Sequence, residues 1–117
     1  MAIRQSADFG RAQRSVSAAT GTGEGDDFAI ASPGRVDIGW NIIVGGTGAW
    51  SALTVLLEGS IDGTNWTTLD TSTSTSTVGE RDVVAVTPQY IRANVSVATV
   101  SSGTPTVSVD ILVRRSA

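Results

Sequence analysis

From residue 27 onward, apolar and polar residues alternate along much of the chain with a period of two. This is the period of a β-strand that buries one face. The clearest case is residues 35–44, where one face carries Val36, Ile38, Trp40, Ile42 and Val44. The same alternation recurs in residues 53–59, 90–97 and 106–114. These four segments are predicted to be half-buried strands.

Shorter strands are predicted at residues 28–31, 66–69 and 81–86, which makes about seven in all. They are rich in Val, Ile and Thr and are separated by clusters of Gly, Pro, Ser and Asp, and no helical period interrupts them. Antiparallel strands with one solvated face, in this number, favour an all-β fold. We expect an antiparallel two-sheet sandwich, of the jelly-roll or Ig-like kind.

Residues 1–25 lack this pattern. Glycines mixed with Ser, Thr and Ala offer no continuous apolar face. We therefore expect an extended N-terminal arm over residues 1–25 and one β-sandwich domain over residues 26–117, since 117 residues leave no room for a second core.

Two connections between the predicted strands carry distinct turn chemistry. Residues 60–65, Ser-Ile-Asp-Gly-Thr-Asn, contain the Asp-Gly pair that a tight hairpin requires. Residues 45–50, Gly-Gly-Thr-Gly-Ala-Trp, are flexible in composition but end in a large aromatic. The Thr-Ser repeat at residues 71–77 has no such feature and is expected to be a loop tip.

The composition removes most catalytic chemistry. The chain has no His, no Cys and no Lys, so His-based triads, thiolate chemistry, Schiff bases and imidazole or thiolate metal sites are all excluded. A carboxylate hydrolase would have to use two of Glu58, Asp62, Glu80, Asp82 and Asp110. Because these residues are predicted on solvated faces or in turns, we expect no catalytic residues, no enzyme and no cofactor.

Calcium is the one metal whose ligands the sequence offers. Residues 25–27 and 60–65 both supply loop oxygens. Neither segment has the EF-hand spacing, and turn formation accounts for both. We expect no metal site.

Charge is distributed unevenly along the chain. Residues 1–14 hold three Arg against one Asp, a balance of +2, whereas residues 15–117 hold five Arg against ten carboxylates, a balance of −5. The net charge of −3 argues against a nucleic-acid partner. No apolar run approaches the length of a membrane span, so no membrane partner is expected either.

The three tryptophans have different predicted roles. Trp40 falls on the buried face of its strand, and Trp66 is expected to pack after the Asp-Gly turn. Trp50 has two interpretations. Its ring either lies exposed, where it would stack on a sugar or anchor a protein interface, or covers the open end of the sandwich.

The segment LLEGSIDGTNWTTLD, followed by Pro88-Gln89-Tyr90-Ile91-Arg92, resembles the turn pattern of discoidin-like, galactose-binding jelly rolls. It also resembles small β-sandwich proteins of tailed-phage virions that decorate or cement the head. Discoidin-type domains are usually longer and often closed by disulfides, so the phage resemblance fits this short, Cys-free chain better.

The phage resemblance implies a non-enzymatic structural protein of the virion, made in the host cytoplasm. Its implied partners are further copies of itself, with a trimer favoured, and a phage capsid protein. The arm would contact them through Arg4, Phe9, Arg11 and Arg14, the arginines binding carboxylates of the acidic body of a neighbour, and Trp50 would add a loop contact. The alternative is a carbohydrate-binding module that uses Trp50 as its stacking platform.

Overall fold

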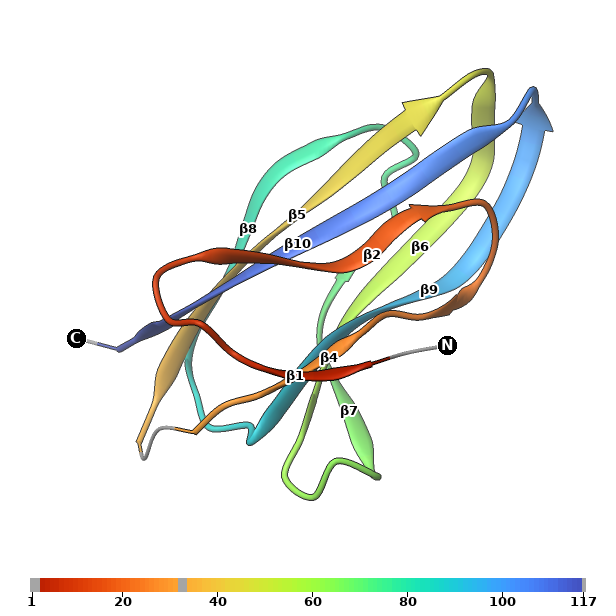
Figure 1. The fold of residues 1–117 in the computed structure, drawn as a ribbon. Helices are drawn as coiled ribbons and strands as arrows, with labels where there is room; N and C mark the ends of the chain where they lie inside the picture. The colour runs from red at the N-terminus through yellow and green to blue at the C-terminus, as the bar shows by residue number, and fades with distance from the viewer. Residues whose placement is uncertain (1–2, 32–33, 117) are drawn as a thin grey trace.

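The structure is a computed structural model that describes residues 3–31 and 34–116. Ten strands form two sheets packed face to face (Figure 1). The described residues contain no helix that is long and apolar enough to cross a membrane. The strands are β1 (Arg4–Ser6), β2 (Ala12–Ala19), β3 (Gly23–Glu24), β4 (Asp27–Ala29), β5 (Val36–Gly46), β6 (Ala49–Ser60), β7 (Trp66–Ser72), β8 (Val78–Val86), β9 (Tyr90–Ser102) and β10 (Pro105–Arg115).

The first sheet has the order β1-β4-β9-β6-β7, with β3 also paired to β9, and the second has the order β2-β10-β5-β8. Every pair is antiparallel except β1 with β4, which is parallel. The expected two-sheet sandwich is confirmed, and all seven predicted strands are present as β4 to β10.

The core lies between the sheets and follows the period-two pattern of the sequence. On β5 the side chains of Val36, Ile38, Trp40 and Ile42 are buried, and Leu53, Val55 and Leu57 of β6 meet them from the other sheet. Burying each such side chain contributes about 1.5–3 kcal/mol to stability. The remaining buried side chains come mainly from β9 and β10.

The expected extended arm is wrong, because residues 4–24 form three strands of the sandwich itself. β1 pairs with β4, β2 pairs with β10 along Val107–Leu112, and β3 pairs with β9. The buried residues of β2 do not alternate with exposed ones, because the register of β2 with β10 shifts twice. These bulges place Ser15 and Val16, consecutive in sequence, both in the interior.

The crossing from β2 to β4 depends on a close backbone approach. The Ser15 hydroxyl donates to the carbonyl of Asp26 at 2.7 Å and accepts from the N–H of Ala93 at 3.0 Å, so it links the two sheets. A Cβ on Gly25 would lie 2.5 Å from the Ser15 carbonyl oxygen. The first strands therefore enter the sandwich at a position that only glycine fits.

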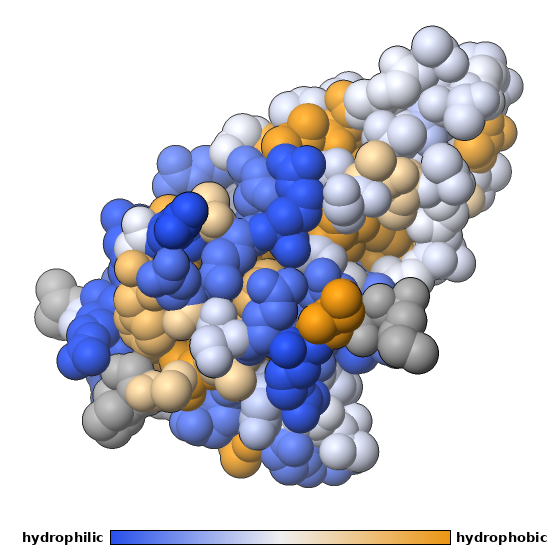
Figure 2. Space-filling model, in the orientation of Figure 1, coloured by the Kyte–Doolittle hydropathy of each residue, from blue (hydrophilic) through white to orange (hydrophobic). Residues whose placement is uncertain are grey.

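The molecule, which measures 45 × 26 × 20 Å, has two ends that differ in charge. The β5–β6 and β9–β10 turns lie together at one end (Figure 1). Residues 41–55 and 95–108, which build this end, contain none of the chain's 8 basic and 11 acidic residues. We call it the charge-free end, and the opposite one the charged end; Figure 2 shows hydrophilic residues gathered over the latter.

Candidate functional site

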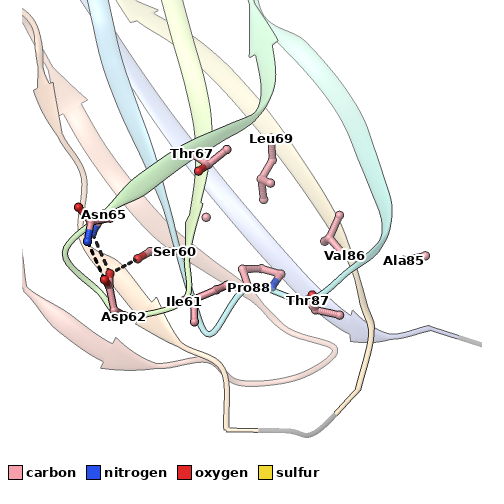
Figure 3. A pocket seen from close by; sticks show the side chains of 11 residues that line it. Ser60, Ile61, Asp62, Asn65, Thr67, Leu69, Ala85, Val86, Thr87 and Pro88 are labelled. Atoms are coloured by element: carbon pink, nitrogen blue, oxygen red, sulfur yellow. Dashed lines mark hydrogen bonds between the residues drawn. The ribbon is translucent and has the colours of Figure 1, made fainter.

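A groove of about 550 Å³ opens at the charged end, between the edge strand β7 of one sheet and the edge strand β8 of the other (Figure 3). Its size falls within the range of ligand-binding pockets. Its lining combines apolar side chains with uncharged polar ones and a single carboxylate, that of Asp62. The lining residues are Gly59, Ser60, Ile61, Asp62, Asn65, Thr67, Leu69, Ala85, Val86, Thr87 and Pro88.

Small residues keep the groove open. A Cβ on Gly59 would lie 2.9 Å from Cδ1 of Leu69 and 3.0 Å from Cβ of Pro88. Because Gly59 has no side chain, Leu69 and Pro88 can lie close to it and form the floor of the groove. On the opposite wall Ala85 contributes only a methyl group. The hollow is therefore a consequence of short side chains between two sheet edges.

Ala85 occupies a bulge of β8 and has a φ of 55°, a conformation that is strained for a residue other than glycine. Its N–H donates to Oδ1 of Asp37 at 2.9 Å, and the same oxygen accepts from the Ser116 hydroxyl at 2.6 Å. These two hydrogen bonds lower the pKa of Asp37 below its ordinary value, and the bond from Ser116 has the larger effect. Asp37 thus remains charged and holds the wall of the groove in its bulged form.

The turn at residues 60–65 forms one rim of the groove, and Asp62 organises it. The Asp62 carboxylate accepts from the N–H groups of Asn65 and Thr64, from the Asn65 amide and from the Ser60 hydroxyl. These bonds hold the pKa of Asp62 well below its usual range, and the bond from the Asn65 N–H has the largest effect. Figure 3 shows the bonds to Asn65 and Ser60. With Gly63 at a φ of 79°, the predicted Asp-Gly turn is confirmed.

An ion pair closes the space between β7 and β8 above the groove. Arg81 of β8 donates to both carboxylate oxygens of Asp70 on β7, each at 2.9 Å, and the indole N–H of Trp40 donates to the same carboxylate at 3.0 Å. The hydrogen bonds from these two donors lower the pKa of Asp70, and those from Arg81 have the larger effect. The pair fixes the separation of the two sheet edges and so the width of the groove.

The groove offers shape and apolar contact but no reactive group. Asp62 is its one ionisable side chain, and four hydrogen bonds inside the turn already occupy that carboxylate. Ile61, 78% exposed, stands at the rim. This arrangement suits an uncharged, apolar segment of another protein, because it can bury that segment without leaving a charge unpaired.

The predicted contact residues of the N-terminus contact this chain's own residues. Arg4 forms a bidentate pair with Asp27, with its Nε 2.9 Å from Oδ1, lies 4.3 Å from the centre of the Tyr90 ring, and donates to the carbonyl of Gly63. Arg14 pairs with Asp110 at 2.8 Å. The basic segment does lie on acidic residues, as its charge suggested, but within one chain.

Phe9, Arg11 and Trp50 are also placed apart from the groove. Phe9 packs against the core, with the guanidinium of Arg115 5.8 Å from its ring centre. Arg11 is exposed and lies 3.7 Å from Asp8. Trp50 is 4% exposed in β6, and its indole N–H donates to the carbonyl of Thr106 at 3.4 Å. Of the two interpretations of Trp50, the structure shows the one in which it covers the end of the sandwich.

The other two tryptophans are both packed. Trp40 is buried in the core as predicted. Trp66 instead packs on the outer side of its sheet, where the Arg92 guanidinium lies 4.0 Å from its ring centre.

The candidate carboxylates do not assemble into a reaction site. Glu58 pairs with Arg92 at 2.8 Å, Asp110 pairs with Arg14, and Asp62 is engaged in its turn. Within the described part of the chain, no group of three metal-ligating side chains occurs. Asp26, in one of the two segments considered for calcium, accepts from the N–H of Ile3 and from Gln5.

The sequence did not reveal the groove, because its walls come from two separate stretches of the chain, residues 59–69 and 85–88. Two features of the sequence nevertheless indicate the groove. Gly59 lies within a strand that buries Leu53, Val55 and Leu57, and Ile61 is a large aliphatic residue inside a turn. Glycine within a strand often marks a close approach, and an aliphatic residue in a turn marks exposed apolar surface.

Comparison with known proteins adds a likeness of fold. No family model and no curated protein matches the chain. Among solved structures the chain is similar to the SPBc2 prophage-derived protein YomS, with a TM-score of 0.61 and 14% sequence identity, over 88% of this chain and 91% of that one. At this identity the likeness establishes a shared fold and leaves function to be argued from the surface.

Proposed function

We propose that this chain is a non-enzymatic structural protein of a phage particle, and that its groove binds a neighbouring protein of that particle. The observation that carries the proposal is the chemistry of the groove. Its single carboxylate is held by four hydrogen bonds, and its other lining groups are apolar or neutral, as in a contact surface.

The likeness to a prophage-derived protein supports the phage setting. It extends over nearly the whole of both chains, so it concerns the complete sandwich and not a single motif. The virion location and the role in decorating or cementing the head belong to this proposal, with a phage capsid protein as the partner.

The structure changes which surface would make the contact. Arg4 and Arg14 form ion pairs with Asp27 and Asp110 of the same chain, and Phe9 packs against the core. An arm that reaches a neighbour therefore no longer supports the proposal. The groove replaces it. Because Trp50 is buried, the carbohydrate-binding alternative loses the platform on which it rested.

The test is to purify the particles of the phage that encodes the chain and to measure the chain in them by quantitative mass spectrometry. We expect a fixed ratio to the major head protein through a density gradient. Recovery in the soluble fraction alone would overturn the proposal.

A substitution pair then tests the groove. Ile61→Asp places a charge on the apolar rim and should reduce incorporation about tenfold, because burying an unpaired carboxylate in an interface is costly. Thr73→Asp, at an exposed position in the β7–β8 loop, is the matched control and should incorporate normally. Equal incorporation of both variants would exclude the groove as the contact.

A further inference from the structure

The outer edge of β9 is covered along only part of its length. β4 pairs with it at Tyr90 and Ile91, and β3 pairs with it at Asn94 and Val95. Beyond Val95, no strand among the described residues pairs with this side of β9, although β6 continues to pair with the other side as far as Ser102. We call residues 96–102 the free edge of β9.

The free edge lies at the charge-free end and carries exposed apolar side chains. Val97 is 41% exposed and Val100 is 45% exposed. The segment Ser-Val-Ala-Thr-Val-Ser-Ser contains no charge and no proline. An unpaired strand edge of this composition is a template for pairing with another strand, because its N–H and C=O groups need partners and its side chains gain by burial.

Other strand edges of the molecule are protected against such pairing. β8 exposes Glu80 and Asp82 and is bulged at Ala85. β2 carries Arg14 and a bulge at Ala18, which has a φ of 48°. Charges and bulges are the usual devices that prevent edge-to-edge association. The free edge of β9 is also irregular, because its pairing with β6 shifts at Val95–Val97 and at Val100–Ser102, but it carries none of the charges that β2 and β8 carry.

Serine hydroxyls bond β9 to β6 along the stretch that carries the free edge. The hydroxyls of Ser96 and Ser101 donate across to the carbonyls of Thr54 and Ala49 on β6, at 3.4 and 3.1 Å, and Ser51 of β6 donates back to Thr99 at 3.1 Å. The strand is therefore already extended before it meets a partner. Preorganisation of this kind lowers the entropic cost of binding.

We propose that the free edge of β9 pairs with the same edge of a second copy of this chain, in an antiparallel, two-fold dimer. A two-fold axis brings a surface against itself, so a charged edge would meet its own charge, whereas this edge meets none. Antiparallel pairing also overlaps the two charge-free ends and sends the two charged ends, which carry the net charge of −3 per copy, in opposite directions.

The contact is short. Seven residues of one strand from each copy bury less than a standard protein interface, so a dissociation constant of about 10 μM to 1 mM is expected. Such a dimer forms where copies are locally concentrated. The inference goes beyond the role in a phage particle and does not depend on it.

Sedimentation equilibrium of the purified chain, from about 10 μM to 1 mM, tests the proposal. We expect a concentration-dependent monomer–dimer equilibrium. Val97→Asp should raise the dissociation constant at least about tenfold, because it brings two like charges together across the axis. Val84→Asp, at a more exposed valine of β8 outside both the free edge and the groove, is the matched control and should leave the constant unchanged.

Thermal unfolding of both variants verifies that they fold, and Val100→Asp serves as a second variant of the edge. A chain that stays monomeric up to 1 mM, or a dimer weakened equally by Val84→Asp, would overturn the proposal. So would a monomer that binds a purified particle protein through Val97, because the occupant would then be another chain. A monomeric chain that is still found in purified particles would leave the proposed function standing.

Discussion

The charged and charge-free ends share one fold but are stabilised by different chemistry. At the charged end, guanidinium groups join carboxylates and lie over aromatic rings. Arg92 binds Glu58 at 2.8 Å and lies 4.0 Å from the centre of the Trp66 ring. Arg4 and Arg81 repeat the arrangement with other partners. These contacts are electrostatic in part, and so they depend on pH and salt.

At the charge-free end the same two sheets continue with neither charges nor ion pairs. Buried Trp50 fills the space between them, and serine hydroxyls bond to backbone carbonyls across β6 and β9. Because this end has no charges, we expect its stability to stay constant when pH and salt change. It also lacks the charges that would keep its strand edges apart from other chains.

The largest expected effect is that of Trp50→Ala, which should lower the free energy of unfolding by about 3–5 kcal/mol through loss of a buried aromatic. Trp66→Ala, at the half-buried tryptophan under Arg92, is the matched control and should cost about 1–2 kcal/mol. Urea unfolding at low and high salt measures both. Only the Trp66 effect should shrink in salt, and a salt-dependent Trp50 effect would contradict the comparison.

Asp70→Asn should have an intermediate effect, about 1–3 kcal/mol at pH 7, because it breaks the charged bonds between Asp70 and Arg81. The folded-state pKa of Asp70 is lowered, so its stabilisation is complete above the unfolded pKa of about 4 and is lost as the pH falls through the folded value.

The difference in stability between wild type and Asp70→Asn should therefore close as the pH falls below about 4. Urea unfolding at a series of pH values measures it. A difference that stays constant down to pH 2 would show that Asp70 acts through packing and not through its charge.

The smallest expected effect is that of Ser51→Ala, which removes one exposed hydroxyl bond to Thr99 and should cost about 0.5–1 kcal/mol. Amide hydrogen exchange near the β9–β10 turn should increase. Ser102→Ala, at an exposed serine nearby, is the control and should leave exchange unchanged. Faster exchange at the charged end instead would mean that the two ends are not independent.

The period-two pattern was sufficient to predict β4 to β10, because each buries one face in regular alternation. Val36, Ile38 and Trp40 are all buried where the pattern placed them. The strands of residues 4–24 could not be predicted in the same way. Their buried positions are a serine and a valine in a bulge, and the partners of β2 and β3 lie more than 60 residues away in the sequence.

The candidate site was harder to predict than the fold. The arginines of the N-terminus were expected to bind carboxylates of a neighbour, whereas Arg4 and Arg14 bind Asp27 and Asp110 of the same chain. Charge alone does not say to which chain the carboxylates belong. The groove depends on the distance between two sheet edges, which Asp70 and Arg81 fix from different sheets. Such a distance is a property of the tertiary structure and leaves no periodic trace in the sequence.

The pairing of β2 with β10 has a consequence for biosynthesis. β2 begins at Ala12 and β10 begins at Pro105, so β2 finds its neighbour only after β10 has left the ribosome. The second sheet is therefore completed only after β10 has been synthesised, and β2 remains unpaired while the strands between the two are being made.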